Sequence, residues 1–134
     1  MYVRDGMSSE VLTVGPDHSL REAAEQMTRR HVGSAVVIDP DLPGPGIVTE
    51  RDVLNAVGEG RDLDSARVGE FLNGKTVFAA PDWSLEQAAA EMVRGKFRHL
   101  IVVEGSEVVG MLSVRDVVRC WVEAGAVSEV PARA

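Results

Sequence analysis

Hydrophobic and polar residues follow two different periods along this chain, and the same succession of periods occurs twice. Short apolar runs typical of strands occur at residues 11–14, 35–39, 76–79 and 100–104. Between them, apolar residues recur at the i, i+3, i+4, i+7 spacing of an amphipathic helix, in two sets: Leu20, Ala23, Ala24 and Met27, then Leu85, Ala88, Ala89 and Met92. The pattern predicts helices over 20–30 and 85–94, each followed by a strand buried on both faces.

Both predicted helices begin with the spacing of a capping box, directly after a Pro-Asp turn. Ser19 can accept a hydrogen bond from the third helical N–H while Glu22 reaches back to the residue that caps the helix. Ser84 and Gln87 repeat this spacing in the second half of the chain.

Two further strands complete the pattern. In the second half, the tight turn Gly105-Ser106 leads into a strand over 107–112. In the first half, the segment from Pro40 to Gly46 holds three prolines and forms a stiffer loop. Pro45 removes a backbone donor, so the strand that follows it is expected to be short.

A short helical turn precedes each half, at Val3–Met7 and Val68–Leu72, and a last helix begins after Thr49 and after Ser113. The predicted order is β-α-β-β-α, twice. Nine of 24 paired positions are identical across the helix and the strand that follows it. A tandem repeat implies two like units related by pseudo-twofold symmetry, so a site at their seam would come in two related copies. We expect an α/β (α+β) fold.

The chain of 134 residues has 45% hydrophobic content, which suits one module whose halves are too small to hold a good core separately. We expect a single module over 1–134, with a first motif at 3–57, a polar linker at 58–67, a second motif at 68–123 and a C-terminal tail at 124–134.

Net charge and hydropathy limit the classes of partner that the protein can have. The formal net charge is −7 and the sequence pI is about 4.9, so a basic nucleic-acid footprint is absent. No apolar run approaches the roughly 18 residues that a membrane helix needs. The N-terminus has no apolar signal core, so we expect a cytoplasmic protein with neither a nucleic-acid nor a membrane partner.

Reactive and metal-binding residues are few. The one cysteine, Cys120, excludes an internal disulfide and a Cys-based zinc site, and we expect it to be buried on the last helix. The three histidines are not arranged to converge, so no metal site is predicted. No nucleophile–base pair or phosphate loop can be placed, so the chain is not expected to be an enzyme.

The sequence Thr49-Glu50-Arg51-Asp52 recurs as Ser113-Val114-Arg115-Asp116, each time after an apolar strand. One interpretation is a second kind of capping box, with the Asp near the positive end of the helix. The other is a ligand site, because a helix N-terminus attracts anions and a carboxylate can accept from two ribose hydroxyls. Gly46 and Gly110, three residues earlier, would leave space for a flat ring against the backbone. The two interpretations are compatible.

With these motifs in this order, twice, the chain resembles the cystathionine-β-synthase (CBS) domain family, specifically a stand-alone tandem pair. The resemblance runs from Val3 to Val118 and rests on Gly-Ile-Val-Thr-Glu-Arg-Asp, Gly-Met-Leu-Ser-Val-Arg-Asp and the Pro-Asp-x-Ser-Leu-x-x-Ala-Ala-x-x-Met helices. It implies two CBS motifs with their sheets packed together, helices outside, and two clefts. In the family such clefts often hold adenosine-containing ligands, so AMP, ADP, ATP, S-adenosylmethionine or NAD could bind, with no cofactor required.

The resemblance also implies the residues of the first cleft. Ser113 and Asp116 would bind the ligand, and Arg98 or His99 would lie nearer its phosphates. The adenine wall would come from the first repeat: Val11, Leu12, Val32, Gly33 and Ser34. Arg98 and His99 could equally be surface or packed strand residues.

The second cleft would be built around Thr49 and Asp52, with His31 on the phosphate side. Its wall would be formed by Thr76, Val77, Phe97 and Arg98. Arg51 and Arg115, inside the two recurring sequences, could contact phosphate or could be surface charges of a helix.

We therefore expect a regulatory module that senses an adenosine-containing nucleotide or a related metabolite in clefts between the two CBS motifs and acts on an unknown protein effector. The alternative is a structural or interaction module with vestigial clefts that dimerises or docks on a partner. A homodimer is predicted, because the helices carry more apolar surface than two small sheets can cover; the last helices contribute Val53, Leu54, Val57, Val117, Val118 and Trp121.

Overall fold

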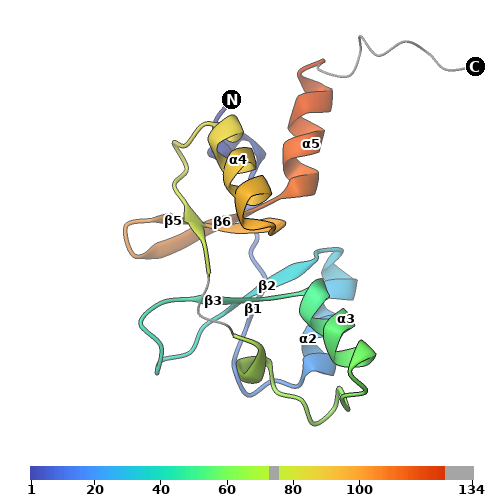
Figure 1. Cartoon of the computed structure of the whole chain (residues 1–134). Coiled ribbons are helices and arrows are strands. Elements are labelled where there is room, and N and C mark those ends of the chain that lie inside the picture. Colours follow the sequence, from blue (N-terminus) through green and yellow to red (C-terminus); the bar gives the residue numbers. More distant parts are fainter. Residues whose placement is uncertain (73–75, 126–134) are drawn as a thin grey trace, which may run out of the picture. The chain divides into compact units, whose positions relative to one another are not determined.

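The computed structural model describes residues 1–72 and 76–125, which form two compact units. One unit is Val11–Thr76 and is called here the β1–β3 unit. The other joins Met1–Glu10 to the chain from Val77 onward and is called the β4–β6 unit. Figure 1 shows the helices of each unit on one side of that unit's sheet.

Both units have the predicted β-α-β-β-α order. The β1–β3 unit contains β1 (Thr13–Val14), α2 (Leu20–Arg30), β2 (Ser34–Val37), β3 (Gly46–Thr49), α3 (Glu50–Gly58) and the 3-10 helix η1 (Val68–Phe71). The β4–β6 unit contains α1 (Val3–Gly6), β4 (Phe78–Ala79), α4 (Leu85–Gly95), β5 (His99–Glu104), β6 (Glu107–Ser113) and α5 (Val114–Glu123). The mixed α/β fold class is confirmed.

Each unit has a three-stranded sheet in which the first strand is parallel and the last antiparallel to the middle one. All four residues of β2 are buried, as predicted for a strand covered on both faces. The first strands, β1 and β4, are shorter than the apolar runs suggested, because each pairs with its neighbour over only two residues.

The predicted difference between the two hairpins is confirmed. The proline-bearing loop leads into a β3 of four residues, whereas β6 has seven. The tight turn before β6 places Gly105 at φ 63°, a left-handed backbone conformation that glycine adopts without steric cost.

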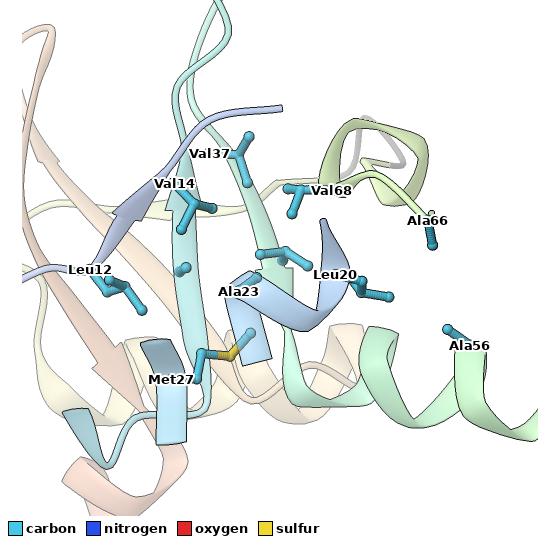
Figure 2. Close-up of a cluster of buried hydrophobic side chains, with 11 residues drawn as sticks. Leu12, Val14, Leu20, Ala23, Met27, Val37, Ala56, Ala66 and Val68 are labelled. Carbon is cyan, nitrogen blue, oxygen red and sulfur yellow. The ribbon is translucent and has the colours of Figure 1, made fainter. Parts of the chain in front are cut away.

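The amphipathic helices supply the core of each unit. In the β1–β3 unit, Leu20, Ala23 and Met27 of α2 belong to one buried cluster with Val14 and Val37 of the sheet, which Figure 2 draws. In the β4–β6 unit the matching residues of α4 pack with the sheet and with α5, in the cluster Leu85, Ala88, Met92, Leu100, Val102, Leu112, Val117 and Cys120. Cys120 is buried, as predicted.

The helical turn that opens each repeat packs in the unit built mainly from the other repeat. In the β4–β6 unit, Val3 is fully buried and its N–H donates to the carbonyl oxygen of Trp83 at 2.9 Å. In the β1–β3 unit, Val68 is fully buried and its N–H donates to the carbonyl oxygen of His18, also at 2.9 Å. These pairs occupy matching repeat positions, so the two turns are held in the same way.

The segment predicted as a polar linker, 58–67, is packed rather than free. The N–H groups of Leu20 and Arg21, at the start of α2, donate to the carbonyl oxygens of Ala66 and Leu63 at 2.8 and 3.1 Å. Ala66 is 1% exposed and belongs to the core cluster. Backbone carbonyl groups of the polar segment thus accept hydrogen bonds from the first N–H groups of α2, and Ala66 belongs to the core. The predicted tail 124–134 lies outside the described residues except for the turn at 124–125.

Candidate functional site

The two recurring Thr/Ser-x-x-Asp sequences form two matching strand-to-helix junctions. Thr49 ends β3 and caps α3, and Ser113 ends β6 and caps α5. We name them the Thr49 junction, in the β1–β3 unit, and the Ser113 junction, in the β4–β6 unit.

At the Ser113 junction, the hydroxyl and the carboxylate bond reciprocally. Oδ2 of Asp116 accepts from the N–H of Ser113 at 2.8 Å and from its hydroxyl at 2.9 Å. The hydroxyl oxygen in turn lies 3.1 Å from the N–H of Asp116. The predicted capping box is therefore confirmed, and it uses one carboxylate oxygen while the side chain of Asp116 stays 21% exposed.

The Thr49 junction has the same two hydrogen bonds to the carboxylate, but among the described residues its hydroxyl accepts no hydrogen bond from a helical N–H. Oδ2 of Asp52 accepts from the N–H of Thr49 at 2.8 Å and from its hydroxyl at 3.3 Å. Asp52 is half-buried, and the described residues give its second oxygen no hydrogen bond. Each junction therefore presents a fixed carboxylate at the start of a helix, where the backbone dipole also favours an anionic group.

Strand pairing brings the start of the middle strand to each junction. Ser34 pairs with Thr49, and the N–H of Glu50 donates to the carbonyl oxygen of Gly33 at 2.9 Å. At the Ser113 junction the same places are taken by other residues. His99 pairs with Ser113, and the N–H of Val114 donates to the carbonyl oxygen of Arg98, again at 2.9 Å.

The two junctions therefore differ in charge although their backbones match. Arg98 is exposed beside Ser113, and no described ion pair or hydrogen bond engages its guanidinium. At the matching place beside Thr49 stands Gly33, and the carboxyl group of Glu50 lies over it, 3.0 Å from where a Cβ would be. Arg51 and Arg115 are exposed and common to both junctions.

The remaining predicted site residues divide between surface and core. Val32 and His31 are exposed at the end of α2, where His31 is the left-handed C-cap (φ 54°), and Phe97 is half-buried at the matching end of α4. Val11, Thr76 and Val77 are half-buried beside the first strands.

The side chain of Leu12 is 7% exposed and lies in the core of the β1–β3 unit (Figure 2), so only its backbone could meet a ligand. The structure thus brings Ser113 and Asp116 together with Arg98 and His99. Their grouping with first-repeat wall residues, and that of Thr49 with second-repeat ones, stays a prediction.

The expectation for the two glycines before the junctions was wrong. A Cβ on Gly110 would lie 2.7 Å from Sδ of Met7, and one on Gly46 would lie 3.0 Å from the side chain of Leu72. The space over each glycine is filled by the helical turn that packs there from the other repeat. The space over each glycine therefore holds a side chain of the protein and not a ligand ring.

Sequence reasoning missed Arg119, one turn after Asp116. Its Nη2 donates to the carbonyl oxygen of Gly6 at 3.0 Å and lies 3.3 Å from Oδ1 of Asp116. The hydrogen bond with Asp116 raises the pKa of the guanidinium. The i, i+3 spacing was a signal for the Asp116 contact. The matching residue at the Thr49 junction is Asn55, so this tie exists at one junction of the pair.

Two absences apply to the described part of the chain. Within residues 1–72 and 76–125, His, Cys, Asp and Glu form no group of three that could hold a metal ion. Over the same residues, no helix combines the length and the apolar character required to cross a bilayer.

Comparison with known proteins identifies the family. Residues 3–59 and 68–123 each match the family model of the CBS domain. The chain belongs to the CBS domain family. The two CBS segments are the two repeats, so the protein carries a tandem CBS pair, as the resemblance indicated.

Individual relatives are of similar size. The CBS domain-containing protein YhcV of Bacillus subtilis (strain 168) is 32% identical over 115 residues, which cover 85% of this chain and 81% of YhcV. The structure of the CBS-domain containing protein ATU1752 from Agrobacterium tumefaciens has a TM-score of 0.79 at 33% identity, covering 88% of this chain and 91% of that one.

A third CBS protein was solved with a ligand. The CBS domain protein PAE2072 from Pyrobaculum aerophilum, complexed with AMP, has a TM-score of 0.77 at 30% identity and covers 87% of this chain and 89% of its own. Other CBS relatives are much longer, and this chain spans only 20–21% of the length of several from Arabidopsis thaliana.

Proposed function

We propose that this CBS pair is a regulatory module, without catalytic activity of its own, that binds an adenosine-containing nucleotide or a related metabolite at its strand-to-helix junctions. The observation that carries the proposal is the duplicated carboxylate at a helix start, fixed by its own cap in both units. The cap uses Oδ2 of each Asp. The other oxygen has no described hydrogen bond in Asp52 and lies 3.3 Å from Nη2 of Arg119 in Asp116. A ribose diol offers the hydroxyl donors that such an oxygen accepts.

The Ser113 junction also has groups that suit a phosphate. Arg98 and Arg115 are exposed there, and His99 is half-buried at the strand start. Guanidinium groups bind phosphate oxygens through two parallel hydrogen bonds. AMP bound by the similar protein PAE2072 supports a ligand of this class for the present chain.

The ligand class is tested by a thermal-shift panel of AMP, ADP, ATP, NAD, S-adenosylmethionine and cyclic dinucleotides. A ligand that binds only the folded protein raises the apparent melting temperature by mass action. We expect adenosine compounds to raise it and the matched nucleotides GMP, CMP and UMP to do so less. A response to no nucleotide, up to millimolar concentration, would leave the interaction module with vestigial clefts as the better account.

We further propose that the chain forms a homodimer through α3 and α5. Leu54 and Val57 of α3 are 62% and 55% exposed, and Val118, Trp121 and Val122 of α5 are 48%, 40% and 49% exposed. Apolar side chains at helical spacing are a common subunit contact. Val53 packs against its unit's core and Val117 is buried, so these two do not belong to the exposed face as the sequence suggested.

A further inference from the structure

We propose that Glu50 makes the two junctions selective for different ligands: phosphorylated adenosine compounds bind at the Ser113 junction, and the Thr49 junction accepts only adenosine compounds without phosphate. This inference rests on the proposed function and assigns each junction its ligand class.

The repeat supplies two junctions with matching backbones, so their side chains can be compared position by position. In both junctions the residue after the cap donates its N–H to the residue before the middle strand, at 2.9 Å in each case. The capping Asp occupies the same position in both, and Arg51 matches Arg115. The junctions differ at Arg119, which Asn55 replaces at the Thr49 junction, at His99, which Ser34 replaces, and in the pair of side chains at the two ends of that backbone hydrogen bond. This pair is Glu50 with Gly33 in one junction and Val114 with Arg98 in the other.

These pairs have opposite charge. The Glu50 carboxyl group lies over Gly33, at 3.0–3.1 Å from a Cβ placed there, and so covers the position from which Arg98 extends in the other unit. A phosphate at the Thr49 junction would meet a carboxylate where the Ser113 junction offers a guanidinium. Like charges at such separations repel, and opposite charges attract, by amounts that change affinity severalfold to many fold.

An uncharged adenosine does not meet this repulsion. The features that suit a nucleoside, a fixed Asp and a paired strand start, are present at both junctions. Gly33 and Glu50 therefore change the preference for phosphate without removing the groups expected to bind the ribose.

The test is an NMR titration that follows the backbone amides of 49–52 and 113–116 separately, with AMP and with adenosine. For the wild-type protein we expect AMP to shift the amides of 113–116 alone, and adenosine to shift both sets. In Glu50→Val, which installs the residue of the other repeat, AMP should also shift 49–52, with affinity raised by about tenfold or more, the scale of a removed like charge. Glu50→Gln should act in the same direction.

The reciprocal variant Val114→Glu should weaken AMP at 113–116 by a similar factor and leave adenosine binding there intact. Both substituted residues are exposed, so the fold should tolerate the exchange. Glu25→Gln, on the surface of α2, changes net charge as Glu50→Gln does and should behave as wild type.

The outcomes separate two failures. AMP binding equally at both junctions of the wild type, or a Glu50→Val protein that still takes AMP at 113–116 alone, would overturn the role of Glu50 while the proposed function stands. Binding of neither AMP nor adenosine at either junction would overturn the proposed function and this inference with it.

Discussion

The sulfur of Cys120 lies where a side chain at Gly6 would have to stand. A Cβ on Gly6 would be 2.7 Å from Sγ, and Cys120 is 1% exposed. Gly6 ends α1, which comes from the first repeat, whereas Cys120 lies on α5 of the second. The absence of a side chain at position 6 is thus what allows the exchanged helical turn to pack against α5.

The substitution Gly6→Ala is therefore expected to destabilise the protein by about 1–3 kcal/mol, the usual cost of overpacking a close contact. Removing the sulfur should relieve the clash, so the double variant Gly6→Ala/Cys120→Ala should lose less than the sum of the single losses. Urea denaturation measures the free energy of unfolding of Gly6→Ala, Cys120→Ala and the double variant. Gly44→Ala is the control, because among the described residues no atom outside its two chain neighbours lies within 4 Å of a Cβ there. Strictly additive losses would show that the two residues do not interact.

Arg119 of α5 links this helix to α1 and to the Ser113 junction, through its hydrogen bonds to the Gly6 carbonyl oxygen and to Asp116. Replacing it by Met should cost about 1–3 kcal/mol, the range for hydrogen bonds to a charged group, less what solvent screening removes from the exposed Asp116 contact. Hydrogen exchange should quicken in α1 above all, because the bond to the Gly6 carbonyl is lost. Arg115→Met, on the same helix with no described partner, should leave exchange in α1 unchanged. Equal effects of the two variants would contradict the assigned role.

The start of α2 should become weaker in acid. The hydrogen bond that Glu22 accepts from the backbone N–H of Ser19 lowers the pKa of that carboxyl below its usual value. The stability that this hydrogen bond contributes is present above the pKa of Glu22 in the unfolded state, and it is lost as the pH falls through the lower pKa of the folded state. Unfolding measured from pH 7 to pH 3 (a range that spans the titration of carboxyl groups) should therefore show a smaller loss in Glu22→Gln than in wild type. An identical pH dependence of stability in Glu22→Gln and wild type would show that Glu22 does not cause the loss of stability in acid.

The proposed dimer face predicts a change in assembly. Leu54→Glu and Trp121→Glu each place a charge on that exposed face of α3 or α5, and a charge buried in an apolar interface is costly. Sedimentation equilibrium should show a wild-type dimer and weakened association in both variants. Leu42→Glu, in the loop before β3 and 41% exposed, should dimerise as wild type does. A wild-type monomer at tens of micromolar, roughly where a modest interface should hold, would count against the dimer.

Much of this structure could be predicted from the sequence because its signals are local. The spacing of Leu20, Ala23 and Met27 fixed the buried side of α2, and the capping box at Ser19 located its start at the observed residue. The pairing of Ser113 with Asp116 was also local, since the two residues are three apart.

Contacts between distant segments could not be read in this way. Met7 fills the space over Gly110 because a turn from the first repeat packs in the β4–β6 unit, and no periodicity records that exchange. Glu50 lies over Gly33 because β2 and β3 pair with Ser34 opposite Thr49. The register was needed before the charge difference between the junctions could be seen.

The most direct test of the central claim is a calorimetric titration of the protein with AMP, comparing wild type with Asp116→Ala. We predict that wild type binds AMP and that Asp116→Ala weakens binding by about 1–3 kcal/mol, the cost of a lost hydrogen bond to a charged group. The control is Asp5→Ala, which removes another capping carboxylate of the same unit, the one that accepts from the N–H of Tyr2 at 2.7 Å. It should leave AMP affinity unchanged. A folded Asp116→Ala protein that binds AMP as wild type does, or a wild type that binds no AMP, would contradict the account.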